Sequence, residues 1–425
     1  MTPVVEVRVW GSRVGAVAPD PKLGAYVFAY APSWRATGIE LAPRMMPLAA
    51  YSPPGQVFPA LPLATFHGLP GVLSDALPDD FGNALVDAWM AAKGVDKASI
   101  TALDRLAYMG RRGLGALEFK PAKGAHSESQ HALEMKSLVE TAREAVQGDL
   151  SSDKMSAAAL AQIIRVGTSA GGARAKAVIA WNPVTNEVRS GQFDAAPGFE
   201  HWLLKFDGMG KDDDLGKGEH YGRVEYAYSL MAHAAGIDMS PCRLLIEGGR
   251  AHFMTRRFDR NNNVKHHVQT LCAMEHLDYK QRATHAYAQA FIAIAQLKLG
   301  DEATDQMFRR MAFNVMARNC DDHTKNHAFI LKQREGWRLA PAYDVTHAFN
   351  PAGEWTFQHL MGVNGKFSGI TRADLMREAD RFSVRHPERM LADVASALAS
   401  WPSFAAQAGL RGQHLDAIAR DFEVV

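Results

Sequence analysis

The chain has 425 residues, of which 47% are hydrophobic and 22% are charged. This length exceeds what one hydrophobic core usually supports, so we expect two or three packed units, and the composition argues against extensive disorder. The formal net charge of +1 excludes a global basic field that would drive non-specific binding of nucleic acid.

Cysteine usage and hydropathy bear on the compartment. The three cysteines, Cys242, Cys272 and Cys320, are far apart and lack a CxxC spacing, which argues against a disulfide framework or a cysteine zinc site. The opening residues alternate apolar and charged from Val5 to Val9, as in a strand rather than a signal peptide. No window has the roughly 18–20 apolar residues of a membrane span. We therefore expect a cytoplasmic protein with no membrane contact.

Residues 1–148 are expected to form a first, β-rich unit. Strands and helices are predicted in it at Val4–Trp10, Ala25–Tyr30, Leu73–Lys93 and Thr101–Met109. The proline and acids of Pro78–Asp80 suit a first helical turn, and Gly94 suits a helix end. Thr101 and Asp104 have the spacing of a capping box.

Two further units are expected after the first. The boundary is placed in the polar stretch Gly148–Asp153, between helical patterns at residues 132–147 and 156–165. Residues 149–247 are expected to form a second unit, and residues 248–425 a third.

The second unit is expected to be a mixed β lobe and the third a helical lobe. The elements predicted in the second are strands at Ala177–Trp181, Trp202–Phe206, Cys242–Glu247 and Ala251–Arg256, and a helix at Arg223–Ala235. The third has mostly helical patterns, with one hairpin near Phe329–Leu339. A mixed β lobe followed by a helical lobe is an α+β arrangement, and it is the layout of two-lobed kinase-like folds.

A Gly-rich stretch opens the second unit. Ser169 to Lys176 reads Ser-Ala-Gly-Gly-Ala-Arg-Ala-Lys. The small residues that would let backbone N–H groups approach a phosphate are Ala170, Gly171, Gly172 and Ala173. A lysine at the end adds a point charge. Gly-Gly turns are nevertheless common, and the Gly-Lys-Ser/Thr of a Walker A motif is absent, so a phosphate loop and an ordinary turn both remain open.

Lys205 lies in the apolar run Trp202–Phe206. A lysine buried there would need a partner, because burying a lone charge is costly. One interpretation is an edge strand with Lys205 pointing to water. The other is a lysine held against the α- and β-phosphates of a nucleotide.

The strongest signal is the run Asp321-Asp322-His323-Thr324-Lys325-Asn326, followed by Asp344 in a Pro-Ala-Tyr-Asp-Val segment. Phosphoryl transfer needs a carboxylate that orients the attacking hydroxyl, and oxygen ligands that hold Mg²⁺ on the phosphates. Asp321, Asn326 and Asp344 supply such a set. The alternative is a solvated polar loop whose Asp and Asn side chains cap turns.

Histidines and serines offer weaker hypotheses. His323 and Lys325 suggest metal binding or acid–base chemistry, but no HExxH pair exists, and His323 is better explained as a hydrogen-bonded brace. Ser169 lacks the Gly-x-Ser-x-Gly pattern of a hydrolase nucleophile. His266 and His267 are expected to form a polar surface pair.

Taken in order, these residues resemble the HipA kinase family. The matching motifs are Ser169-x-Gly-Gly-Ala-Arg-x-Lys176, Lys205, Asp321-x-His323-x-Lys325-Asn326 and Tyr343-Asp344, with Val9-Trp10-Gly11, Leu73–Gly82 and Arg257-Phe258-Asp259-Arg260 beside them. The resemblance covers nearly the whole chain. It implies a two-lobed kinase-like fold of the HipA and phosphoinositide-kinase type, with a mixed β N-lobe and a helical C-lobe.

The resemblance also implies an activity and partners. Family members are toxin halves of bacterial toxin–antitoxin pairs and ATP-dependent Ser/Thr kinases, and the best-known type phosphorylates an aminoacyl-tRNA synthetase. A protein substrate of that kind is therefore implied, together with ATP, Mg²⁺ and a HipB-like helix-turn-helix antitoxin. Because no helix-turn-helix or basic stripe is evident, contact with DNA would be indirect, through the antitoxin.

The resemblance assigns roles residue by residue. Asp321 would be the catalytic aspartate that accepts or orients the proton of the substrate hydroxyl, Asn326 and Asp344 would hold Mg²⁺, and Lys205 would contact the nucleotide phosphates. Residues 170–173 would form the phosphate loop, and Lys176 would end it. Ser169 matches the serine that the family autophosphorylates, and a phosphate there would repel those of ATP. Glu225 lies on a helix like the kinase αC glutamate and is expected to pair with Lys176 or Lys205.

Two departures accompany the match. Asp322 stands where the best-known member has glycine, and it either joins the metal shell or caps the loop. Arg174 replaces a glutamine. The rival functions are a catalytically weak scaffold or corepressor, which would lack Asp321, Asn326 or Asp344, and a small-molecule kinase, which would lack the N-terminal β unit.

Overall fold

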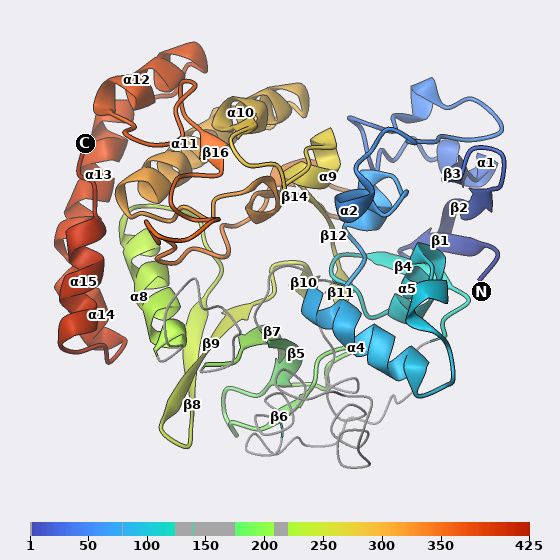
Figure 1. Ribbon diagram of the computed structural model, residues 1–425, viewed down its shortest axis with the longest axis horizontal. Helices are drawn as coiled ribbons and strands as arrows, with labels where there is room; N and C mark the ends of the chain where they lie inside the picture. The colour runs from blue at the N-terminus through green and yellow to red at the C-terminus, as the bar shows by residue number, and fades with distance from the viewer. Residues whose placement is uncertain (1, 79, 124–137, 139–174, 208–219) are drawn as a thin grey trace.

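The computed structural model describes residues 2–78, 80–123, 138, 175–207 and 220–425. The N-terminal strands lie at one end of the molecule and the C-terminal helices at the other, with a second sheet between them (Figure 1). The predicted boundary at 148 and the helical patterns at 132–147 and 156–165 fall outside the described residues, apart from Leu138. Among the described residues, no helix combines the length and hydropathy of a membrane span.

The N-terminal unit is built on an antiparallel sheet in the order β3-β2-β1-β4. Its strands are β1 (Val5–Val9), β2 (Ser12–Asp20), β3 (Ala25–Tyr30) and β4 (Leu117–Lys120). Val5, Val7 and Val9 are at most 1% exposed, so the alternation in the sequence does mark the face of β1 that lies in the core.

Helices α4 (Asp80–Ala91) and α5 (Ala102–Met109) cover this unit. The capping box of α5 is present: the Thr101 hydroxyl accepts a bond from the Asp104 backbone N–H at 3.1 Å, and the Asp104 carboxylate accepts one from the Thr101 N–H at 3.2 Å. The predicted helix at Leu73–Lys93 is instead two helices, because the short α3 (Gly71–Ser74) ends before Pro78 and α4 begins after it. The remaining short elements here are α1 (Pro32–Arg35), α2 (Leu63–Phe66), η1 (Leu48–Ala50) and η2 (Lys97–Ser99).

The second sheet has the order β6-β5-β7-β9-β8. Its strands are β5 (Lys176–Trp181), β6 (Val188–Ser190), β7 (Glu200–Lys205), β8 (Cys242–Glu247) and β9 (Arg250–Arg256), and α8 (Tyr221–Ala234) packs against β8 and β9. The predicted boundary at 247/248 falls in the turn of the β8–β9 hairpin. Since β9 pairs with both β7 and β8, this sheet extends to Arg256.

The C-terminal lobe is mainly helical and has its own core. Its helices are α9 (Leu271–Glu275), α10 (Tyr287–Gln296), α11 (Asp301–Met316), α12 (Arg372–Arg381), α13 (Pro387–Ala399), α14 (Trp401–Gln407) and α15 (Gln413–Asp421). Tyr228 of α8, Phe313 of α11 and Trp401 of α14 meet in it, each at most 1% exposed. The helix α8 thereby joins the second sheet to the helical lobe.

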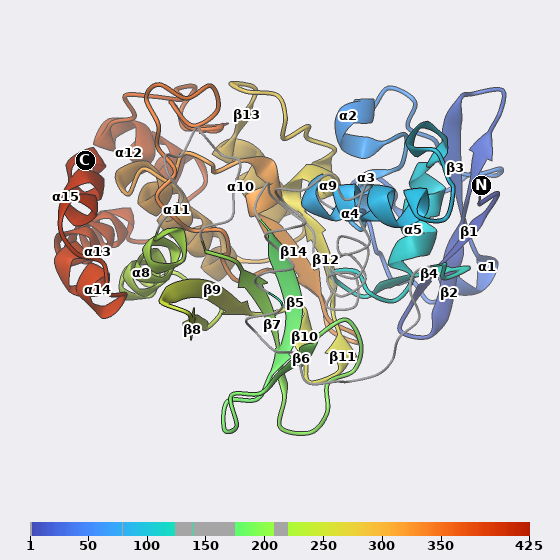
Figure 2. The ribbon, with the colours of Figure 1, turned by 60° about the horizontal axis from the view of Figure 1, so that its bottom comes forward.

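A small sheet is formed by β12 (His267–Thr270), β14 (Ala328–Leu331) and β15 (Trp337–Leu339). Its strands β12 and β14 lie between the N-terminal unit and the C-terminal helical lobe (Figure 2). The prediction that His266 and His267 form a polar surface pair is wrong, since the two residues are only 7% and 1% exposed. The His267 ring is within 3.2 Å of the Leu41 carbonyl oxygen, because β12 faces the N-terminal unit. The remaining short elements are β10 (Arg260–Asn261), β11 (Val264–Lys265), β13 (His285–Ala286), β16 (Met361–Gly362) and η4 (Thr324–Asn326).

Buried polar contacts fasten the N-terminal unit to the rest of the chain. Asp259 of the Arg257–Arg260 motif is 1% exposed, forms ion pairs with Arg257 at 2.6 Å and Arg260 at 2.7 Å, and accepts a hydrogen bond from the Gly115 N–H at 2.7 Å. Asp75 accepts bonds from the backbone N–H and the hydroxyl of Thr270 at 2.7 and 2.9 Å. These contacts fix the N-terminal unit beside the C-terminal lobe.

Candidate active site

Lys205 lies at the end of β7, inside the second sheet rather than at its edge. The strand pairs with β5 on one side and with β9 on the other, so the edge-strand interpretation is wrong. The Lys205 side chain is 13% exposed, and its Nζ donates to Glu225 of α8 at 2.6 Å and to Asp344. A lysine in this strand therefore holds two carboxylates that come from different elements, and the pairing expected between Glu225 and Lys205 is present.

These three charges change one another's ionisation. Burial alone would lower the pKa of Lys205, but the carboxylates of Asp344 and Glu225 outweigh it and raise that pKa above its ordinary value. Burial alone would raise the pKa of Asp344, but Lys205 and then Lys176 lower it to about 2. Asp344 is therefore an ionised carboxylate, and its side chain is 29% exposed.

Lys176 lies beside Lys205 on the neighbouring strand. The two residues are directly paired in the β5–β7 register, and Lys176 is 3% exposed. Its charge acts on Asp344, as noted above. The residues that precede it in the predicted phosphate loop, Ser169 and 170–173, lie outside the described residues.

The run that carries Asp321 connects α11 to β14. The Asn326 side-chain amide donates to the Asp321 backbone oxygen at 2.7 Å and so closes the loop over the turn η4. The Asp321 carboxylate is 41% exposed, and its Oδ1 accepts a hydrogen bond from the Trp355 indole at 3.0 Å. His323 Nε2 is 3.8 Å from the same oxygen, which is an ion-pair distance and too long for a hydrogen bond.

Asp344 and Asp321 are close enough to interact electrostatically. Partial removal of Asp321 from water is the main cause of its raised pKa, and the charge of Asp344 adds to it. The Tyr343 hydroxyl donates to the Lys325 carbonyl oxygen at 2.5 Å and ties the Asp344 segment to the loop 321–326. Asp344 has φ +51°, a left-handed conformation that is uncommon outside glycine and that often marks functional sites.

The side chains of Lys325 and His323 both contact the Tyr279 ring. The Lys325 Nζ lies 4.7 Å from the centre of the Tyr279 ring, and the His323 ring centre lies 5.1 Å from it. The charge of Lys325 also acts on Asp75 of the N-terminal unit. These two residues thus lie on the side of Tyr279, while Lys205, which contacts Asp344, and Lys176 lie on the second sheet.

Asp322 is a structural residue, so neither of its expected roles is correct. It is 0% exposed, and its carboxylate accepts hydrogen bonds from Tyr287 at 2.8 Å and from the backbone N–H groups of Leu360 and Met361 at 2.8 and 3.3 Å. Its Oδ2 also lies 3.1 Å from His359 Nδ1. With both oxygens engaged in the core, Asp322 neither reaches a metal site nor caps its own loop.

His359 completes a buried arrangement that sequence reasoning missed. Burial alone would lower its pKa, but Asp322 outweighs burial and raises the pKa of His359 to about 10, so the imidazole is protonated at neutral pH. Its Nε2 is 3.8 Å from the Cys320 sulfur. A Cys–His–Asp order resembles a nucleophilic triad, but the residues are at most 1% exposed, so no substrate reaches it.

The donor set fits a hard cation. The Asn326 amide nitrogen is used in the loop, which leaves its carbonyl oxygen to serve as a ligand, and Asp344 offers an ionised carboxylate. Mg²⁺ in phosphoryl-transfer sites takes one or two carboxylates and completes its shell with waters and phosphates. The described residues contain no cluster of three or more His, Cys, Asp or Glu side chains suited to a metal.

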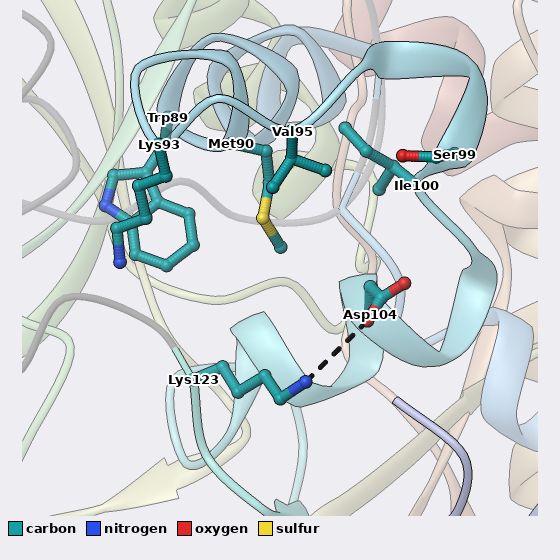
Figure 3. Close-up of a pocket in the computed structure, with 8 residues that line it drawn as sticks. All are labelled: Trp89, Met90, Lys93, Val95, Ser99, Ile100, Asp104 and Lys123. Atoms are coloured by element: carbon teal, nitrogen blue, oxygen red, sulfur yellow. Dashed lines mark ion pairs between the residues drawn. The ribbon is translucent and has the colours of Figure 1, made fainter. Parts of the chain in front are cut away.

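A separate cavity of about 340 Å³ lies in the N-terminal unit (Figure 3). Apolar side chains of Trp89, Met90, Val95 and Ile100 line it, and Lys123 forms an ion pair with Asp104 at 3.9 Å on one side. None of its residues belongs to the elements that carry Lys205, Asp321 or Asp344, so it is not part of the candidate active site.

The second sheet and the helical lobe, with a lysine–glutamate pair in one and an Asp–Asn–Asp set in the other, have the architecture of a two-lobed kinase-like fold. Residues 168–420 match the model of the HipA-like C-terminal domain, and residues 5–120 match that of the HipA N-terminal domain. The chain therefore belongs to the HipA family. No curated protein sequence matches it significantly.

A solved structure supports the fold. The structure of the toxin–antitoxin system HipA, HipB and operator DNA complex of Shewanella oneidensis MR-1 is similar with a TM-score of 0.67 and 16% identity, over 98% of this chain and 94% of that one. The Helicobacter pylori proinflammatory kinase CtkA covers 52% of this chain and 88% of its own at 11% identity, but its TM-score of 0.34 is too low to support an argument.

Proposed function

We propose that this chain is an ATP- and Mg²⁺-dependent protein serine/threonine kinase that acts as a HipA-like toxin. The observation that carries the proposal is Lys205, held between Glu225 and Asp344 with Asp321 close by. In kinases, a strand lysine paired with a helix glutamate contacts nucleotide phosphates, and a neighbouring Asp, Asn and Asp orient the hydroxyl and hold the metal.

In this proposal, one group of residues binds the nucleotide phosphates and the metal, and another orients the acceptor hydroxyl. Lys205 would bind the phosphates, and Lys176, beside it, would add charge at the end of the Gly-rich loop. The side-chain oxygens of Asn326 and Asp344 would hold Mg²⁺, which when bound would neutralise charge on the phosphate oxygens. Glu225, 2% exposed in its side chain, would keep the Lys205 ammonium in place.

Asp321 would accept a hydrogen bond from the acceptor hydroxyl and orient it for transfer. Among the residues that the structure describes, a hydrogen bond reaches only its Oδ1, from Trp355, so Oδ2 is available to accept a hydrogen bond from a serine or threonine hydroxyl. A carboxylate with a raised pKa is a stronger base than an ordinary aspartate at neutral pH, which suits proton removal during transfer. His323 and Lys325 would support this loop from the side of Tyr279.

The partners follow from the family. We propose a HipB-like helix-turn-helix antitoxin, contact with DNA only through that antitoxin, and a translation component such as an aminoacyl-tRNA synthetase as the protein substrate in the cytoplasm. The similar Shewanella structure is a complex with HipB and operator DNA, which supports the antitoxin partner. Autophosphorylation at Ser169 would place negative charge in the Gly-rich loop and repel ATP.

Intact mass after incubation with Mg-ATP tests the proposal, with Asp321→Ala as the control. The expected result is one phosphoryl increment on the chain, located on Ser169 by fragmentation and absent from the control. An increment elsewhere would remove Ser169 as the acceptor and keep the kinase. If the chain neither binds ATP nor transfers phosphate with Mg²⁺ or Mn²⁺, the kinase function is wrong, and a scaffold or corepressor becomes the better account.

A small-molecule kinase is the remaining rival. The N-terminal domain match over residues 5–120 favours the protein kinase, since that unit is part of the family's architecture. Phosphate found on aminoglycoside or choline rather than on protein would reverse this preference.

A further inference from the structure

The indole of Trp355 contacts the carboxylate to which we assign the acceptor hydroxyl. Its Nε1 donates to Asp321 Oδ1 at 3.0 Å, although the two residues are 34 positions apart. Within the described residues, no other side chain hydrogen-bonds to this carboxylate, and His323 stays at 3.8 Å. One oxygen of Asp321 is thus fixed by an indole, and the other has no such partner.

The segment that carries Trp355 is built to hold the indole there. The Asn350 backbone N–H donates to the Thr356 carbonyl oxygen at 3.3 Å, and that of Gly353 donates to the Asn350 carbonyl at 3.0 Å, so the segment folds back on itself. Just before it, the Ala348 carbonyl accepts a bond at 3.0 Å from the N–H of Cys320, the residue that precedes Asp321. The segment is therefore attached to the catalytic loop by its backbone.

A second attachment comes from the loop before β13. Arg282 forms an ion pair with the Glu354 carboxylate at 3.2 Å and also donates to the Glu354 backbone oxygen. Glu354 is 83% exposed in its side chain, and Trp355 beside it is half-buried. The segment that carries Trp355 is therefore attached to its neighbours before and at Glu354, while it remains at the surface.

We propose that Trp355 is a positioning residue for Asp321, an inference that rests on the proposed kinase function. By fixing Oδ1, the indole N–H sets the rotation of the carboxylate and leaves Oδ2 directed toward the acceptor hydroxyl. A charged acceptor strengthens a hydrogen bond, and orientation of a reacting group has a large effect on rate. The residue acts through Asp321 and does not touch the nucleotide-binding lysines.

The test is Trp355→Phe, which keeps an aromatic ring and removes the donor. Trp337→Phe is the matched control, because the Trp337 indole also donates at 3.0 Å, to the Glu40 carbonyl oxygen. Phosphate incorporation into the chain itself and into added myelin basic protein gives kcat and the KM for ATP, and ATP titration gives Kd. We expect kcat to fall about 10-fold or more in Trp355→Phe, with KM and Kd for ATP within about twofold.

The outcomes separate the inference from the function beneath it. If the wild-type chain transfers no phosphate, the kinase function fails and the inference falls with it. If the wild type is active and Trp355→Phe has an unchanged kcat, the inference alone is wrong. A joint loss of kcat, ATP affinity and melting temperature would make Trp355 a structural residue, and a higher kcat would make its indole an inhibitory cover.

Arg282→Ala gives a milder second variant. It removes the ion pair with Glu354 and leaves the indole in place, so kcat should fall by only about two- to fivefold at unchanged ATP Kd. A larger loss than in Trp355→Phe would contradict the proposed route through the indole.

Discussion

The two faces of the catalytic loop differ sharply, although adjacent aspartates define them. Asp321 is 41% exposed in its side chain and accepts one indole hydrogen bond. Asp322 is fully buried, contacts Tyr287 and a protonated His359, and accepts two backbone N–H groups. One carboxylate is open for chemistry, and the other fixes the loop to the helical lobe.

This difference shows how one turn of chain can serve two functions. On the buried side, Asp322 and His359 pair away from water, so removal of either partner would leave an uncompensated buried charge. The open side keeps charges that are only partly neutralised, among them Asp321 and Asp344, whose mutual repulsion contributes to the raised pKa of Asp321. A rigid inner side positions the reactive outer side.

Removal of the buried cation should give the largest effect on stability. His359→Ala leaves the Asp322 charge buried with its partner gone, and breaking a buried pair in this way costs about 3–5 kcal/mol. Urea unfolding at pH 7 measures it, with the exposed His233→Ala as the control. A loss below about 1 kcal/mol would mean that the pair does not stabilise the loop.

The same pair predicts how stability depends on pH. His359 has a pKa of about 10 in the folded chain against an ordinary value of 6.5, so the native state binds more protons between those values. Its contribution is complete below about pH 6.5 and is lost as the pH rises through about 10, by at most about 1.4 kcal/mol per pH unit. The difference in unfolding free energy between wild type and His359→Gln should shrink over that window. A constant difference would contradict a protonated His359.

At the candidate active site, Lys205→Met should lower the rate of phosphoryl transfer by about 100-fold or more, because loss of one preorganised hydrogen-bond donor commonly lowers the rate by such a factor. Glu225→Gln should have a smaller effect, since the lysine keeps Asp344 as a partner. The exposed Lys97→Met is the matched control, with a side chain that is 77% exposed. Near-normal transfer by Lys205→Met would remove this lysine from the site.

Tyr287→Phe should have the smallest effect of the set. It removes a donor to Asp322 at 2.8 Å and an acceptor for the Asn314 amide at 2.9 Å, for a loss of about 2 kcal/mol on unfolding. Tyr51→Phe is the control, because the Tyr51 hydroxyl makes no hydrogen bond within the described residues. Equal stability of wild type and Tyr287→Phe would show that the backbone N–H groups alone hold Asp322.

Features carried by local signals could be predicted from the sequence. The α+β layout was one, the capping box at Thr101 and Asp104 was another, and Gly94 and Gly236 have the left-handed φ of +76° and +79° expected at helix ends. The candidate set Asp321, Asn326 and Asp344 could be recognised by residue type, since phosphoryl transfer uses carboxylate and amide oxygens, and its catalytic and metal-binding roles stay a prediction. Glu225 followed from its place on a helix after the lysine strand.

Features that depend on distant partners could not be predicted. Nothing in the order Asp321-Asp322 tells which acid is buried, because the partners Tyr287 and His359 lie 35 and 37 residues away from Asp322. Trp355 has no motif spacing to Asp321, and its position depends on backbone contacts at Ala348. His267 looked polar and exposed, but β12 lies against the N-terminal unit.

The most direct test of the two-faced loop measures phosphoryl transfer and urea unfolding side by side in Asp321→Ala and Asp322→Ala, with Asp322→Asn as the milder variant if the alanine chain does not fold. We expect Asp321→Ala to lose transfer by about 100-fold or more and to keep its unfolding free energy within about 1 kcal/mol. Asp322→Ala should lose about 3–5 kcal/mol of stability. Full transfer by Asp321→Ala, or an Asp322→Ala chain as stable as wild type, would contradict the account.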